Sequence, residues 1–246
     1  MGKVNLGMLE MNIVDADHSR VVMDNNTRRY MLECRNDLNE RRRKLFSDLC
    51  DLVYESAGKE RVRDVFAAYL FTFGSAQRPH EFLAVCSEFD SRPRFVWEHF
   101  HYFWNSFDAI PHYKFAKLLR SIRSDWRADH IDDLKDRDFY DELPEEIIAF
   151  RGQDRCAPLG LSWTVDKEVA ETFAQGHRGI RNKSPIIIAA HIKKKNVAGA
   201  YVSRFETELV LFDPRHATRR QSEELGVSGN DIRSRSTDRA RWRLSS

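Results

Sequence analysis

The distribution of apolar residues changes near Leu143-Pro144, and this change limits the folds that the chain can adopt. From Thr27 to about residue 130, apolar residues recur mostly at spacings of three, four or seven, as on amphipathic helices. After the change, short apolar runs typical of strands follow, at residues 147–150, 185–192 and 206–212. The sequence therefore predicts an α+β protein with a mainly helical region over residues 1–140.

Glycine and proline divide the helical region into separate helices. A long helix is predicted from Thr27 to Gly58, and a second from Arg61 to Phe71, before Gly74. Because proline has a fixed φ that suits the first turn of a helix, further helices are expected after Pro79, Pro93 and Pro111.

An aromatic cluster at residues 95–107 falls within one of these helices. Phe95, His99, Phe103 and Phe107 follow one another at steps of four, and such a stripe is typical of a core rather than of a cofactor or base-stacking site. His99 and His101 are two residues apart and would point to different sides of a helix. We therefore expect no zinc site here, and no metal is required by the chemistry proposed below.

The composition excludes several classes of protein. Hydrophobic residues make up 41% and charged residues 32% of the chain, and no run is apolar enough to cross a bilayer. The first residues lack the pattern of a secretory signal. The four cysteines form no CxxC pair, which favours buried thiols in a reducing compartment: Cys34, Cys50, Cys86 and Cys156. We therefore expect a cytoplasmic protein with no membrane partner.

The segment from Arg215 to Arg243 is rich in Arg, Ser and Asp and poor in apolar residues. We expect residues 216–246 to form a basic, weakly ordered tail. A solvated tail is the simpler interpretation, and an electrostatic arm for an acidic partner is the alternative.

Three short motifs follow one another in the strand-rich part. The first is Phe150-Arg151-Gly152, where a predicted strand ends. The second is GLSWT at residues 160–164, directly before a helix predicted over residues 166–176. The third is RFETE at residues 204–208, which leads into an apolar strand. In order, the motifs supply Arg, Ser-x-Thr and Glu-x-Glu.

Together these motifs resemble the ADP-ribosyltransferase superfamily, in the Arg-Ser-Glu class of cholera-toxin-like and arginine-specific transferases. The phrases FRG, GLSWTVDKEVAETFA and ETEL are similar to small phage and bacterial members. The resemblance covers residues 145–214, and its specificity comes from the order and context of motifs that are individually weak. It implies a split, mixed β-sheet core at residues 141–215, with NAD as the substrate that donates ADP-ribose.

The residue types also suit this chemistry by themselves. Arg151 offers a planar fork of donors for the pyrophosphate of NAD, and Gly152 lets bare backbone approach a flat nicotinamide ring. Cleavage of the nicotinamide–ribose bond builds positive charge on the ribose, which a fixed carboxylate stabilises. Glu208 is the candidate carboxylate, and Ser162 is expected to hydrogen-bond it and hold its orientation.

The remaining candidates surround these groups. Thr164 is expected to support the strand corner, while Trp163 and Phe173 are expected near the nicotinamide or, equally, in the core. Glu206 lies two residues before Glu208, on the same face of a strand. The resemblance implies that Glu206 engages the acceptor, which favours protein arginine as acceptor, with nucleic acid as the alternative.

Two loops and two other functions complete the expectations. Residues 193–203 are expected to form the acceptor-facing loop, and residues 175–184 to lie near the nicotinamide, with Arg178 and Arg181 contacting phosphate or solvent. An NAD glycohydrolase toxin would use the same site with water as acceptor. A non-catalytic module would instead use the helical region to bind protein or nucleic acid. The resemblance implies that the protein acts inside a bacterial cell, as a phage-encoded or a host-defence protein.

Overall fold

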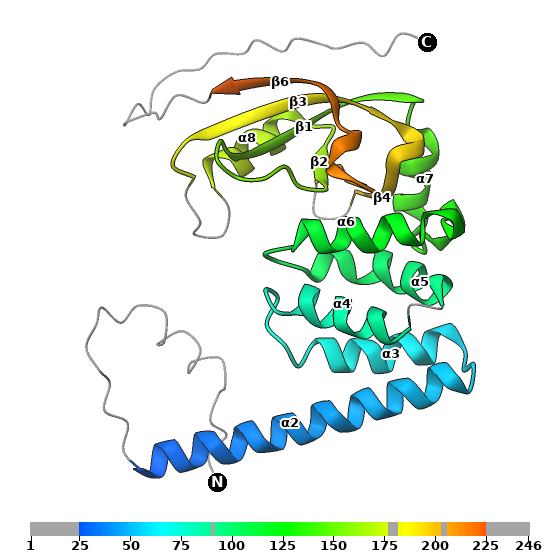
Figure 1. The fold of residues 1–246 in the computed structure, drawn as a ribbon, viewed down its shortest axis with the longest axis vertical. Helices are drawn as coiled ribbons and strands as arrows, with labels where there is room; N and C mark the ends of the chain where they lie inside the picture. The colour runs from blue at the N-terminus through cyan, green and yellow to red at the C-terminus, as the bar shows by residue number, and fades with distance from the viewer. Residues whose placement is uncertain (1–24, 90–91, 177–181, 203–205, 225–246) are drawn as a thin grey trace. The chain divides into compact units, whose positions relative to one another are not determined.

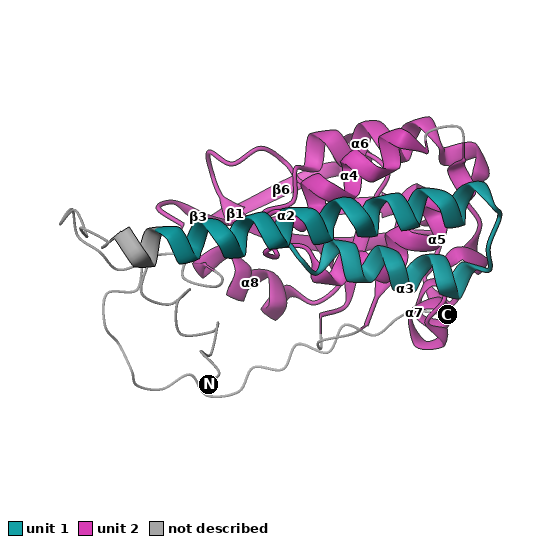
Figure 2. Ribbon diagram, turned by 90° about the horizontal axis from the view of Figure 1, so that it is seen from below, with its two compact units in different colours: residues 1–73 teal, residues 74–246 magenta. Residues whose placement is uncertain are grey.

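The structure, a computed structural model, describes residues 25–89, 92–176, 182–202 and 206–224 of the chain (Figure 1). The chain divides into two compact units, residues 1–73 and residues 74–246 (Figure 2). The predicted change near residue 140 is the place where helices give way to strands, whereas the division into compact units falls after Phe73.

The first unit contains two helices, α2 (Asn25–Tyr54) and α3 (Lys59–Leu70). Their contact includes the rings of Phe46 and Tyr69, whose centroids are 5.8 Å apart. Arg42 on α2 donates to the hydroxyl of Thr72, at 3.0 Å, just after α3 ends. The two helices predicted for this stretch are thus present.

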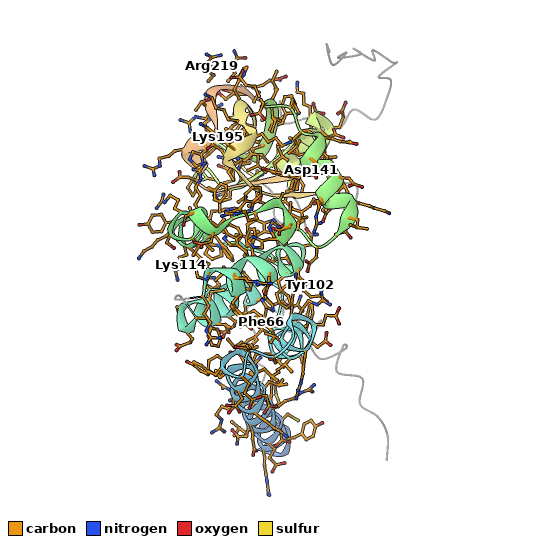
Figure 3. All side chains as sticks on the ribbon, turned by 90° about the vertical axis from the view of Figure 1, so that its right-hand side faces the viewer. Phe66, Tyr102, Lys114, Asp141, Lys195 and Arg219 are labelled. Carbon is orange, nitrogen blue, oxygen red and sulfur yellow. The ribbon has the colours of Figure 1, made fainter. Side chains whose placement is uncertain are left out.

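The helices α4 (Arg78–Glu88), α5 (Pro93–Phe103) and α6 (His112–Ser121) begin near the prolines, as predicted. Helix α7 (Leu134–Glu142) follows without a proline, and short 3-10 turns lie between these helices: η1 (Trp104–Ser106), η2 (Arg123–Asp125) and η3 (Ala128–His130). Figure 1 shows α4, α5 and α6 in succession, with α6 nearest the sheet. Tyr102 and Lys114 lie on the outer surface of α5 and α6 (Figure 3).

The aromatic cluster on α5 forms the core of this helical layer, which confirms the sequence interpretation. Phe82, Phe100, Phe103 and Phe115 are all at most 1% exposed. The two histidines of the cluster bond to protein groups. His99 Nδ1 lies 2.7 Å from the carbonyl oxygen of Phe95, and His101 Nδ1 lies 3.3 Å from the hydroxyl of Tyr201.

Six strands form one sheet in the second unit, in the order β4-β5-β2-β1-β3-β6. Their bounds are β1 (Glu146–Asp154), β2 (Ser162–Thr164), β3 (Pro185–Lys193), β4 (Val197–Tyr201), β5 (Glu208–Leu211) and β6 (Thr218–Glu224). Every strand pair among the described residues is antiparallel, so the predicted mixed sheet is wrong. The halves β4-β5-β2 and β1-β3-β6 are joined through one register pair, Phe150 with Thr164.

Helix α8 (Lys167–Gln175) packs against this join. Its first turn is capped by Asp166, whose carboxylate accepts from the backbone N–H of Glu168 at 2.9 Å. Ala170 and Ala174 face the sheet, and a side chain at Gly152 would overlap the carbonyl oxygen of Ala170 and the backbone nitrogen of Ala174. The helix can therefore approach β1 this closely only because residue 152 is glycine.

Two stretches form strands where the sequence predicted loop or tail. Residues 197–201 were assigned to an acceptor-facing loop, but β4 is buried along its whole length and contacts α7, so this assignment is wrong. The predicted weakly ordered tail contains β6, which pairs with β3 although all its residues are exposed. Backbone pairing and ion pairs with Lys167 and Arg155 hold β6 in place. These interactions do not require apolar residues, so the sequence of β6 lacks the apolar pattern by which a strand is predicted. Residues 225–246 lie outside the described part of the chain.

The thiols differ in exposure. Cys86 is buried and Cys50 is partly buried, whereas Cys34 and Cys156 are exposed, so the prediction of buried thiols holds for only part of the set. Among the described residues, no helix combines the length and apolar character that a membrane span needs.

Candidate active site

Glu208 opens β5, and its half-buried carboxylate is held by groups from two other elements. The indole Nε1–H of Trp104 donates to Oε1 of Glu208 at 3.0 Å, and the Ser162 side chain lies close enough to this carboxylate to lower its pKa. Burial raises the pKa of Glu208, while the bonds from Trp104 and Ser162 and the charge of Arg151 act in the opposite direction. The expected contact between Ser162 and Glu208 is therefore present.

Arg151 lies within β1, because the strand continues to Asp154 rather than ending near Phe150 as predicted. Its Nη1 donates to the carbonyl oxygen of Ser162 at 2.6 Å, and its Nε donates to Oε1 of Gln153 at 2.7 Å. A side chain at Gly160 would lie 2.5 Å from Nη2 of Arg151. Burial lowers the pKa of Arg151 to about 10, so the guanidinium stays charged at neutral pH.

His112, the first residue of α6, braces the loop that precedes β2. Its Nδ1 accepts from the backbone N–H of Leu161 at 3.2 Å. Burial, followed by the nearby charge of Arg151, lowers the pKa of His112 to about 3. The imidazole is therefore neutral at physiological pH, and its single proton lies on Nε2, since Nδ1 is the acceptor.

Glu206 precedes β5 rather than belonging to it. The backbone N–H of Glu208 donates to the carbonyl oxygen of Glu206 at 2.9 Å, which closes a tight turn around Thr207. The prediction that both carboxylates share a strand face is thus wrong in its geometry. Glu206 is nevertheless close enough for its charge to raise the pKa of Glu208.

Thr164 ties the corner together, as expected. Its hydroxyl lies 3.2 Å from that of Thr207, and it accepts from the backbone N–H of Asp166 at 3.1 Å. The end of β2, the start of α8 and the turn before β5 therefore meet at one side chain.

All eight candidate residues line one cavity of about 620 Å³, a volume within the usual range for small-molecule sites. They are Arg151, Gly152, Ser162, Trp163, Thr164, Phe173, Glu206 and Glu208. We call the side formed by Arg151, Ser162, Glu206 and Glu208 the sheet wall. Trp163 is only 2% exposed and donates to the carbonyl oxygen of Gly160 at 3.3 Å, so it belongs mainly to the core.

A second side of the cavity comes from residues 104–112, which we call the helical wall. It includes Trp104, Asn105, Asp108 and His112, none of which was a candidate from the sequence. Trp104 and Glu208 are 104 residues apart, and Trp104 has the spacing and composition of a core residue. No local pattern could have identified it.

The expectation for Gly152 changes in the structure. Bare backbone at this position accommodates α8, and it also lines the cavity. The absence of a side chain is explained by helix packing, whatever lies in the cavity. Arg178 and Arg181, expected near phosphate, lie outside the described residues.

Within the described residues, no group of three or more His, Cys, Asp or Glu side chains is arranged to hold a metal ion. The cavity contains four carboxylates and one guanidinium among its described lining: Asp108, Asp154, Glu206, Glu208 and Arg151. In comparisons with known proteins, the chain matches no family model, no curated protein and no solved structure.

Proposed function

We propose that this chain is an NAD-dependent ADP-ribosyltransferase that moves ADP-ribose onto a macromolecular acceptor. One observation carries the proposal. Three separate motifs supply Arg151, Ser162 and Glu208 to a single cavity, in which Arg151 donates to the backbone carbonyl of Ser162 and the Ser162 side chain is near enough to lower the pKa of Glu208. Coincidental motifs would have no reason to converge in this way.

Glu208 is the proposed catalytic residue. Its carboxylate stabilises the positive charge that develops on the ribose when the bond between the ribose C1′ and the nicotinamide nitrogen breaks. The bonding electron pair leaves with nicotinamide, which departs as a neutral molecule. Because the bond from Trp104 already holds the carboxylate in place, little reorganisation is needed during the reaction.

Arg151 is the proposed contact for the pyrophosphate. Its two described side-chain bonds use two of the five N–H donors of a guanidinium, so donors remain for phosphate oxygens. Its bond to the Ser162 carbonyl also links phosphate binding to the group that orients Glu208.

Glu206 is proposed to engage the acceptor. An arginine side chain would supply the lone pair that forms the new bond to C1′, and Glu206 would take the proton that the nitrogen releases. The predominance of carboxylates in the described lining favours such a cationic acceptor over nucleic acid. The narrow join between β1 and β2 supports the split core that the resemblance implies.

The test uses NAD labelled in its adenylate portion, incubated with the purified chain and a bacterial lysate. Glu208→Gln is the test variant, and Glu168→Gln, an exposed carboxylate on α8, is the matched control. Samples are then treated with protease or with nuclease before separation. We expect label that depends on Glu208 and is removed only by protease.

Other outcomes decide between the alternatives. Label that only nuclease removes would identify nucleic acid as the acceptor. Loss of NAD without label would indicate a glycohydrolase with water as acceptor. Stable NAD, with no label in any sample, would contradict the proposal and favour a binding module.

A further inference from the structure

We propose that Trp104, from the helical wall, is a positioning residue that holds the carboxylate of Glu208 for catalysis. The inference rests on the proposed function for its catalytic meaning. It rests on the structure for the contact itself, the 3.0 Å bond from the indole Nε1–H to Oε1.

The indole of Trp104 is fixed from several sides. It is 2% exposed, and its ring packs edge-on against Phe115 and Phe107 and at a tilt against Phe100, with centroids 5.1 to 6.3 Å apart. The backbone carbonyl of Trp104 also accepts from the N–H of Phe107 at 3.1 Å, which closes the η1 turn. A donor held this firmly defines where Oε1 must lie.

The indole is well suited to orient an ionised carboxylate. Its Nε1–H is a donor only, so it can bond a carboxylate oxygen but offers no acceptor to the proton of a neutral acid. The Ser162 hydroxyl lies on another element and is near enough to the carboxylate to act as a second donor. Both donors favour the ionised form of Glu208, which is the form that stabilises positive charge on the ribose.

The helical layer therefore contributes to the chemistry as well as to the fold. The aromatic core of α5 and α6 holds Trp104 in place, and Trp104 is the side chain that contacts the carboxylate of Glu208. This gives part of the helical region a specific role within the cavity.

The test compares Trp104→Phe with Trp126→Phe. Phenylalanine keeps an aromatic ring at either position and removes one indole N–H. Trp126 makes a bond of the same type, 2.9 Å to the carbonyl oxygen of Ala198 on β4, and does not line the cavity. It therefore controls for loss of an indole bond between the helical layer and the sheet.

We expect Trp104→Phe to lower the kcat of nicotinamide release about 10- to 100-fold, as for loss of one bond to a charged group, with little change in KM for NAD. Because the donor favours the carboxylate, its loss should raise the pKa of Glu208 and move the acid limb of the pH–rate profile to higher pH. Trp126→Phe should leave the kcat and the acid limb of the pH–rate profile unchanged. An unmoved acid limb, or equal losses in the two variants, would overturn the proposal.

A second readout does not depend on any activity. In protein with ¹⁵N-labelled tryptophan, the Trp104 indole signal is identified by its loss in Trp104→Phe. We expect this signal to shift in Glu208→Gln and to titrate with Glu208 in the unmodified chain. If the Trp104 signal shifts and titrates in this way while NAD stays intact in the activity assay, the contact between Trp104 and Glu208 stands and the proposed function fails. If it does neither, the inference fails.

Discussion

The sheet wall and the helical wall of the cavity supply groups that meet at one carboxylate, yet they are encoded in different ways. The sheet wall comes from residues that stand in short motifs on or beside strands, such as Arg151 and Ser162. The helical wall comes from Trp104 and His112, which in the sequence resemble ordinary residues of the predicted helical region. Chemistry that is local in sequence can be predicted, and chemistry that depends on packing cannot.

The two walls also differ in how they use burial. Arg151 keeps its charge despite burial, with a pKa lowered to about 10, and serves as the cation of the cavity. His112 loses its charge, with a pKa lowered to about 3, and serves as a neutral brace. We propose that the sheet wall carries the reaction and that the helical wall sets its geometry.

The largest effect should come from Glu208 on the sheet wall. Glu208→Gln removes the charge that is proposed to stabilise the ribose, so nicotinamide release should fall by at least about 10²–10³-fold. The folded state should persist, as judged by circular dichroism and thermal unfolding. The Glu168→Gln control should retain activity. Activity retained in a folded Glu208→Gln protein would remove this carboxylate from the mechanism.

Gly152→Ala tests whether the sheet wall is shaped by α8 or by a ligand. The added methyl would overlap backbone atoms of Ala170 and Ala174, so the free energy of unfolding should fall by about 1–3 kcal/mol in urea titrations. Gly74→Ala is the control, because nothing lies within 4 Å of a side chain there. Unchanged stability in Gly152→Ala would mean that α8 does not approach β1 this closely.

Acid should weaken the ionic contacts of Asp213, which follows β5. Arg215, and to a smaller extent Arg120 on α6, bind its buried carboxylate, and these bonds hold its pKa below the usual range. A lowered folded-state pKa contributes stability above the unfolded value of about 4, and this stability is lost as pH falls below it.

We therefore expect the free energy of unfolding to decrease below about pH 4, and to do so less steeply in Asp213→Asn. Chemical denaturation between pH 3 and pH 7 measures the free energy of unfolding of the unmodified chain and of the variant. Identical pH dependence in the two proteins would show that Asp213 does not couple the two layers.

The smallest effect should come from Glu206, which is proposed to engage the acceptor and whose charge also raises the pKa of Glu208. Glu206→Gln should impair transfer to the acceptor more than it impairs hydrolysis of NAD, since the nicotinamide–ribose bond is broken by a different group. Parallel assays of labelled acceptor and released nicotinamide give the ratio. An equal loss of both activities would argue against an acceptor role.

The fold was predictable where the apolar pattern is strong. The helices after Pro79, Pro93 and Pro111, and the strands β1 and β3, follow from periodicity and from apolar runs. Strands β2, β4 and β6 did not follow from the sequence pattern. Strand β2 has three residues, β4 contains small side chains, and β6 is wholly exposed. Their pairing partners, rather than their own residues, make them strands.

The residues of the candidate site could be predicted from the sequence, but the tertiary contacts that hold them in place could not. All eight candidate residues lie at the cavity, but the bond from Trp104 to Glu208 depends on a tertiary contact across the two layers. The geometry around Glu206 also required the structure, because the turn at Thr207 removes it from the strand.

The most direct test of the account is a crystal structure of the Glu208→Gln variant with NAD. We expect nicotinamide in the cavity beside Gly152, the ribose C1′ next to the side chain at position 208 and to Trp104, and the pyrophosphate on Arg151. NAD bound elsewhere on the chain, or a cavity that stays empty at saturating NAD, would contradict it.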